Sequence, residues 1–179
     1  SASSGGPMML KVSKTSISDV ILIEPKVYKD DRGFFFESFN EQAFHAAINR
    51  KVSFVQDNHS QSVQDVLRGL HYQIKQPQAK LVRVVSGRIY DVAVDLRKNS
   101  KTFGKFFSCI LSEKNSKSIY IPPGFAHGFC CLEKENYIIY SCTQYRSANT
   151  EVGIKYNDKD LKINWPIKRP IISKKDNSS

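Results

Sequence analysis

Apolar and polar residues alternate in short runs along most of the chain, with the period of two that a β-strand requires. The clearest runs fill residues 81–96 and are interrupted at Ser86-Gly87. Because glycine permits a tight reversal, we predict a β-hairpin there. Further strands are predicted at residues 20–23, 34–38, 53–56, 106–111, 118–121, 128–132 and 137–143.

Helical periodicity is confined to one short segment, residues 41–49. Asn40 can cap this segment, in which Phe44, Ala47 and Ile48 recur at helical spacing. Many short strands, frequent turns and so little helix predict a mainly β fold, an antiparallel barrel or sandwich with a few short peripheral helices. The interior of such a barrel is where a ligand would bind.

The length of 179 residues leaves room for one sizeable core, so we expect a single domain over residues 9–179. Residues 1–8 are expected to be an appended remnant or a disordered tail. No apolar run approaches the roughly 18 residues that span a bilayer, and no export signal opens the chain. Four cysteines without a Cys-x-x-Cys pair favour free thiols in a reducing cytoplasm.

The formal net charge of +10 points to an anionic partner, although a basic surface can also serve solubility alone. Lys and Arg are scattered, with only a mild concentration at residues 162–175. The clustered basic helix typical of a nucleic-acid binder is not seen. A small phosphorylated ligand is therefore expected, and a nucleic-acid partner is not.

Two side chains suit proton chemistry at a carbonyl compound. His71, in VLRGLHYQ, is the first candidate for a general base because a neutral imidazole accepts a proton at about neutral pH. Taken alone, a structural histidine is the commoner case. Lys80 shares a strand face with Val82 and Val84, so it either snorkels at an edge or places a cation on a developing oxyanion.

Tyr140 shares its strand face with Ile138 and Cys142, which would let its phenol reach a cavity as a general acid. Most such tyrosines merely pack. Tyr145 lies an odd number of residues further on and faces the other way in a regular strand. A pocket shared by the two tyrosines requires a bulge or a strand end between them.

His127 lies in the stiff, aromatic segment IPPGFAHGF, residues 121–129, which we expect to be a loop that precedes an apolar strand. A metal-binding jelly roll would present a His-x-His pair, a following Glu and a later His. Here the first pair is His71-x-Gln73, and no Glu follows closely. We therefore expect no metal.

Taken together, residues 9–176 resemble the dTDP-4-dehydrorhamnose 3,5-epimerases, a family of the cupin jelly-roll type. The strings that carry the resemblance are EPKVYKDDRGFFFES, FVQDNHSQS, VLRGLHYQ, KLVRVVSG, DVAVDLRKNSKTFG, LSEKN, IPPGFAHGF, NDKDLKINWP and SKKD. The resemblance implies that a dTDP-linked 4-keto-6-deoxyglucose is inverted at C3 and C5 without a cofactor. A C4 ketone acidifies both neighbouring C–H bonds, so one base and one acid on opposite faces of the ring suffice.

The resemblance also implies a role for each site residue. His71 is the base, Asp176 its partner, Lys80 stabilises the enolate, and Tyr140 returns the proton. A homodimer is implied too, in which the neighbouring subunit completes the site. The implied ligand contacts are Arg68 on the diphosphate, Tyr145 stacked on thymine, Arg32 and Glu37 across the dimer interface, and Gln56, Asn58, Lys80, His127, Glu151 and Lys175.

Two departures from the family pattern concern nucleotide contacts: a short loop containing Pro77 between His71 and Lys80, and Arg146 where a second tyrosine is frequent. Single-site epimerases and ketoisomerases use the same groups and are the first alternative. A non-catalytic sugar-binding barrel, a nucleic-acid binder and a metal-dependent oxygenase are the others. The presence of all four implied catalytic residues favours an epimerase.

Overall fold

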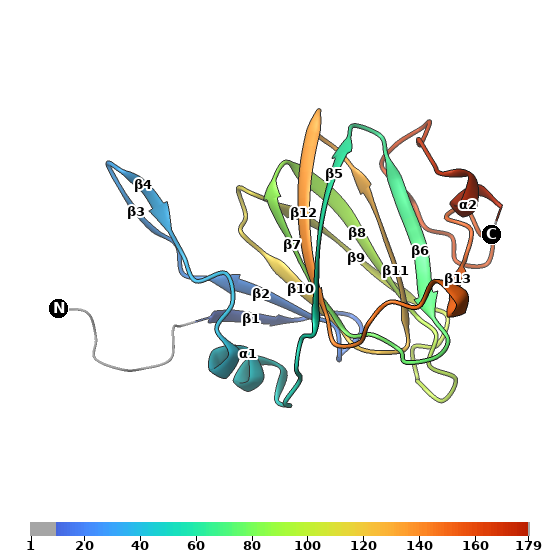
Figure 1. Ribbon diagram of the computed structural model, residues 1–179, viewed down its shortest axis with the longest axis horizontal. Helices are drawn as coiled ribbons and strands as arrows, with labels where there is room; N and C mark the ends of the chain where they lie inside the picture. The colour runs from blue at the N-terminus through green and yellow to red at the C-terminus, as the bar shows by residue number, and fades with distance from the viewer. Residues whose placement is uncertain (1–9, 179) are drawn as a thin grey trace.

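Two antiparallel β-sheets face each other in the computed structural model, which describes residues 10–178 (Figure 1). The six-stranded sheet has the order β1 (Leu10–Lys14), β2 (Ile21–Pro25), β10 (Ser118–Ile121), β7 (Lys80–Ser86), β12 (Glu135–Cys142) and β5 (Gln56–Val63). The five-stranded sheet has the order β13 (Glu151–Gly153), β6 (Leu67–Gln73), β11 (Phe125–Cys131), β8 (Arg88–Asp95) and β9 (Phe106–Ser112). The predicted mainly β, antiparallel architecture is confirmed. The prediction for residues 1–8 concerns residues outside the described range.

The helical elements are short and peripheral: α1 (Glu41–Ile48), the 3-10 turn η1 (Ala148–Thr150) and α2 (Lys174–Asn177). The helix predicted at residues 41–49 is confirmed as α1. Its cap is Asn40, whose side-chain oxygen accepts a hydrogen bond of 3.0 Å from the amide of Ala43. Phe44 and Ile48 turn inward and pack on the outer face of the six-stranded sheet.

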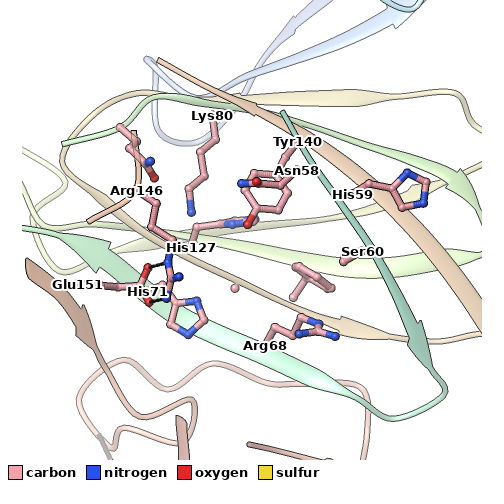
Figure 2. A pocket seen from close by; sticks show the side chains of 13 residues that line it. Asn58, His59, Ser60, Arg68, His71, Lys80, His127, Tyr140, Arg146 and Glu151 are labelled. Atoms are coloured by element: carbon pink, nitrogen blue, oxygen red, sulfur yellow. Dashed lines mark hydrogen bonds and ion pairs between the residues drawn. The ribbon is translucent and has the colours of Figure 1, made fainter. Parts of the chain in front are cut away.

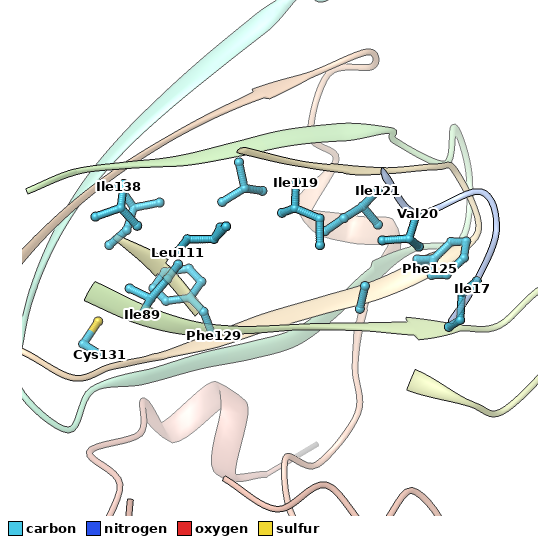
Figure 3. Close-up of a cluster of buried hydrophobic side chains, with 13 residues drawn as sticks. Ile17, Val20, Ile89, Leu111, Ile119, Ile121, Phe125, Phe129, Cys131 and Ile138 are labelled. Carbon is cyan, nitrogen blue, oxygen red and sulfur yellow. The ribbon is translucent and has the colours of Figure 1, made fainter. Parts of the chain in front are cut away.

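The main core fills one part of the space between the two sheets. Figure 3 shows Ile119, Ile121 and Ile138 of the six-stranded sheet opposite Ile89, Leu111 and Phe129 of the five-stranded sheet. Val82 and Val84, which share the face of Lys80, belong to the same cluster. The alternation predicted for this strand therefore directs the Lys80 side chain to the interior.

Both faces of strand β8 are covered, and apolar side chains lie on each. Ala93 points into the main core, whereas Val92 and Val94 pack on the opposite side against the C-terminal segment that carries Leu161 and Trp165. This segment lies outside the five-stranded sheet and leads to α2 (Figure 1). The last residues of the chain are thereby brought to the sheet that carries His71.

The predicted hairpin across Ser86-Gly87 is wrong. β7 pairs with β10 and β12, whereas β8 pairs with β9 and β11, so the turn carries the chain from one sheet to the other. Gly87 has φ of +97°, and a Cβ there would approach the Asn136 side chain to 2.6 Å. The glycine does permit a sharp turn, but the partners of the two strands are set by packing far along the chain.

Three other predicted boundaries are wrong. The strand expected at residues 53–56 begins only at Gln56 and runs through the polar stretch to Val63. The strand expected at residues 34–38 covers only β4 (Gly33–Phe35), paired with β3 (Tyr28–Asp30). His127 lies within β11 and not in a loop, because the Pro-Pro-Gly turn ends at Gly124.

The β3–β4 hairpin projects away from the two sheets (Figure 1). Its Phe34 and Phe35 are 68% and 65% exposed. Arg32 lies in the turn, paired with Asp30 at 2.6 Å. An exposed aromatic hairpin of this kind is typical of a surface that a partner covers.

A buried carboxylate fixes the end of β8. Asp95 is 0% exposed and accepts hydrogen bonds from Arg97, Ser100 and Thr102. Burial alone would raise the pKa of Asp95, but these donors outweigh it and hold the pKa well below its ordinary value of 3.8. Arg97 also reaches Asp19 at 2.7 Å, which ties this loop to the segment that precedes β2.

We expect Asp95→Asn to lower the free energy of unfolding by about 2 to 4 kcal/mol at about pH 7, because Arg97 loses its buried partner. Since the folded-state pKa is depressed, the contribution is present above the ordinary pKa of 3.8 and is lost as the pH falls below it. Urea unfolding at several pH values tests this, with the exposed Asp31→Asn as control. An equal acid dependence in the wild type and Asp95→Asn would contradict it.

Candidate active site

A cavity of about 350 Å³ opens between the two sheets beside the main core (Figure 2). Pockets of this size hold small organic ligands. Both sheets contribute side chains to its wall, and many of these carry charge or hydrogen-bonding groups. The lining residues are Asn58, His59, Ser60, Arg68, His71, Gln78, Lys80, His127, Gly128, Phe129, Tyr140, Arg146 and Glu151.

His71 comes from β6 of the five-stranded sheet and is held by the end of the chain. Its Nε2 lies 2.6 Å from Oδ1 of Asp176 in α2. The other carboxylate oxygen of Asp176 accepts a hydrogen bond of 3.1 Å from the amide of Gly69. Asp176 is only 6% exposed, although it is three residues from the end of the sequence. With Nε2–H donated to Asp176, Nδ1 is the ring nitrogen left to accept a proton.

Lys80 and Tyr140 reach the cavity from the facing sheet, on β7 and β12. The ammonium nitrogen of Lys80 lies 5.5 Å from the centroid of the Tyr140 ring. Burial lowers the pKa of Lys80 and raises the pKa of the Tyr140 phenol. Because the ordinary pKa of a phenol already lies well above 7, the raised pKa keeps the Tyr140 phenol protonated at neutral pH.

His127 lies beside His71 on the neighbouring strand, where the two residues are register partners. Its Nε2 is 2.7 Å from Oδ2 of Asp91, and both side chains are buried. Burial lowers the pKa of His127, while the Asp91 carboxylate opposes that effect. Asp91 was not predicted as a site residue, although the sequence around it carries a signal. An acidic residue on the inward face of a largely apolar strand needs a hydrogen-bonding or charged partner.

Glu151 closes one side of the cavity but its carboxylate is already occupied. It accepts hydrogen bonds from Arg146, Lys175 and Gln73. Arg146, noted in the sequence only as a departure from the family pattern, lines the cavity. Tyr145 beside it is 64% exposed and is not among the lining residues, because β12 has ended at Cys142.

The other predicted ligand contacts lie at different distances from the cavity. Arg68 lines it and donates from Nε to the Ser62 hydroxyl at 3.0 Å. Gln56 is near its edge and donates to Asn58 at 3.0 Å. Arg32 and Glu37 lie on the projecting hairpin and the segment after it, so the structure does not bring them to the cavity of their own chain.

Within residues 10–178 no three His, Cys, Asp or Glu side chains come together in a way that could hold a metal ion. The same part of the chain has no helix with the length and apolar character needed to cross a membrane. What the cavity does offer is an oriented imidazole on one wall, and a phenol and an ammonium group on the other. Such a site can remove a proton from one side of a carbonyl compound and return it on the other.

Comparisons with known proteins agree with this chemistry. The family model for dTDP-4-dehydrorhamnose 3,5-epimerase matches residues 14–179. The dTDP-4-dehydrorhamnose 3,5-epimerases of Shigella flexneri and Pseudomonas aeruginosa are 52% and 51% identical over 168 residues, which cover 93% of this chain and of each relative.

Among solved structures, a dTDP-6-deoxy-D-glucose-3,5-epimerase from Legionella pneumophila in complex with dTDP-4-keto-L-rhamnose matches with a TM-score of 0.93. It is 44% identical, and the match covers 96% of this chain and 92% of that one. The family resemblance drawn from the sequence strings is thereby confirmed. The chain belongs to the dTDP-4-dehydrorhamnose 3,5-epimerase family.

Proposed function

We propose that this protein converts dTDP-4-dehydro-6-deoxy-D-glucose to dTDP-4-dehydro-L-rhamnose by inverting C3 and C5. The observation that carries the proposal is the placement of His71 and Tyr140 on facing sheets, with the cavity between them (Figure 2). A sugar ring in this cavity would have a base on one face and an acid on the other. That arrangement is what inversion at carbon requires.

His71 removes the proton at C3 or C5, and the electron pair moves into the C4 carbonyl to give an enolate. Asp176 stabilises the imidazolium that forms and keeps Nδ1 free to act as the base. Lys80, whose side chain lines the cavity, donates to the enolate oxygen. Tyr140 then protonates the same carbon from the opposite face, so no net oxidation or reduction occurs.

The polar wall of the cavity suits a nucleotide sugar. Arg68 lines the cavity, and its planar guanidinium group suits the paired oxygens of a diphosphate. The Ser60 hydroxyl is buried, lines the cavity and has no hydrogen-bond partner within residues 10–178, so a ligand hydroxyl would satisfy it. We assign His127, Asn58 and Gln56 to further ligand contacts, and Tyr145 to thymine.

We further propose a homodimer in which Arg32 and Glu37 reach the nucleotide bound by the other subunit. The exposed Phe34 and Phe35 of the β3–β4 hairpin support a second copy as the partner, because they leave an aromatic surface uncovered. The four cysteines are all free thiols, which supports a reducing compartment, the cytoplasm. The single domain proposed for residues 9–179 is consistent with one pair of facing sheets.

The first prediction concerns the base. In heavy water, the wild type should introduce deuterium at both C3 and C5 of the 4-keto sugar, as followed by proton NMR. His71→Asn should slow both exchanges by about 10²- to 10⁴-fold, because both use the same base. Circular dichroism and dTDP binding establish that the variant is folded. Undiminished exchange would exclude His71, and wild-type exchange at one carbon only would favour a single-site epimerase.

The second prediction concerns the acid. Tyr140→Phe should retain part of the exchange, because His71 can return deuterium to the face from which it took the proton. Net inversion should fall by about 10²-fold or more. Tyr137→Phe, on the same strand but the other face, is the matched control and should behave as wild type. Full inversion by Tyr140→Phe would show that another group supplies the proton.

The third prediction tests the shared site. His71→Asn and Arg32→Ala, each weakly active alone, should regain about one quarter of wild-type activity when refolded together. In a mixed dimer, one site has an intact His71 and receives an intact Arg32 from its partner. The control mixture of His71→Asn with Tyr140→Phe should stay inactive, because each of its sites keeps one lesion. Failure of the first mixture to gain activity would rule out contact across subunits.

A further inference from the structure

We propose that Glu151 and Lys175 are positioning residues, and that they hold α2 in place so that Asp176 stays hydrogen-bonded to His71. We call Glu151, Arg146, Lys175 and Gln73 the Glu151 cluster. The proposal deepens the function given above and rests on His71 as the base. It differs from the family resemblance, which implies that Glu151 and Lys175 contact the ligand.

The Glu151 carboxylate has no acceptor site left for a ligand. One oxygen accepts from Arg146 Nη2 at 3.1 Å and from Lys175 Nζ at 2.7 Å. The other accepts from Arg146 Nε at 2.9 Å and from Gln73 Nε2 at 3.2 Å. A carboxylate offers about four lone-pair sites, and four donors fill them. Glu151 therefore acts on protein groups at this cavity.

The cluster joins the end of the chain to the strand that carries the base. Glu151 and Gln73 are register partners in the β13–β6 ladder, and His71 lies two residues from Gln73 on β6. Lys175 and Asp176 are consecutive in α2, and they bind Glu151 and His71 respectively. Two consecutive residues of α2 are thus attached to two adjacent strands, Lys175 to β13 and Asp176 to β6.

α2 depends on such attachments because it has only four residues. A helix of this length is not stable by itself. Its cap, the Ser173 hydroxyl on the amide of Asp176, fixes the turn but does not fix the turn to the sheet. Backbone hydrogen bonds of Ile171 with Leu67 and Asp65 hold the chain just before the turn, and the contacts of Lys175 and Asp176 with β13 and β6 hold the turn itself.

An exposed ion pair contributes little to stability, and the Lys175 side chain is 54% exposed. Glu151, however, is only 9% exposed, and its hydrogen bonds with Arg146, aided by Lys175, lower the pKa of the Glu151 carboxyl to about 2. The Glu151 carboxylate therefore stays charged at neutral pH. We expect the cluster to affect the position of Asp176 more than stability, since a shift of about 1 Å at a catalytic group can cost about 10²-fold in rate.

The test compares Lys175→Met with Lys175→Arg, which keeps the cation, and with Lys174→Met, which removes an exposed lysine from the same turn. We expect Lys175→Met to lower kcat by about 10- to 100-fold with KM changed less than about 2-fold. Lys175→Arg should restore most of the rate, and Lys174→Met should match the wild type. In an Asp176→Asn background, Lys175→Met should cost less than about 2-fold, because the contact that it protects is already lost.

A second readout does not depend on catalysis. The amide of Gly69 donates to Asp176, so its hydrogen exchange reports whether α2 is seated. We expect this exchange to be faster by about 10-fold in Lys175→Met and unchanged in Lys174→Met. Faster Gly69 exchange in a protein that exchanges no sugar protons would refute the proposed function and leave the positioning role intact.

Three results would overturn the positioning role. Unchanged Gly69 exchange in Lys175→Met would mean that Lys175 does not hold α2. A higher KM at unchanged kcat would mean that Lys175 contacts the substrate. Losses that add in the double variant with Asp176→Asn would mean that the two residues act separately.

Discussion

The separation of the proposed base and the proposed acid onto two facing sheets is the constraint on which the rest of the account depends. His71 lies on the five-stranded sheet, whereas Tyr140 and Lys80 lie on the six-stranded sheet, so the packing of the sheets fixes the gap in which a sugar ring fits. The main core beside the cavity maintains this gap. A site built on strands holds its groups more precisely than one built on loops. In the proposed reaction every step transfers one proton, which side chains can carry.

The hydrogen bond between His71 and Asp176 couples this framework to the end of the chain. The C-terminal segment covers the outer face of the five-stranded sheet, and α2 then brings Asp176 back to the cavity. The contact is between residues 105 positions apart. A four-residue helix cannot position a carboxylate alone, and the end of the chain has further attachments in the backbone hydrogen bonds of Ile171 and in the hydrogen bond from Lys175 to Glu151.

Local patterns in the sequence predicted many of the strands and the faces of their side chains, but they missed β1, β3, β6 and β13 and did not predict the partners of the strands. The alternation placed Lys80 on the face of Val82 and Val84, and Tyr140 on the face of Ile138 and Cys142, since a strand's period is independent of what it pairs with. It left open whether those faces point inward, and the structure shows that both line the cavity. The same alternation predicted a hairpin at Gly87, where the chain instead changes sheets, because pairing depends on contacts remote in sequence. The polar strand β5 shows no alternation of apolar and polar residues, so most of its length was not predicted. The role of Asp176 and the individual ligand contacts came only from the family resemblance. The four hydrogen bonds that fill the Glu151 carboxylate could be seen only in the structure.

The most direct test of the central claim is a crystal structure with dTDP-L-rhamnose bound. We expect the sugar ring to lie between the sheets, with the His71 ring against one face at C3 and C5, and the Tyr140 hydroxyl against the other, each within about 4 Å. A ring with both groups on the same face, or a ring bound outside the cavity, would contradict the account.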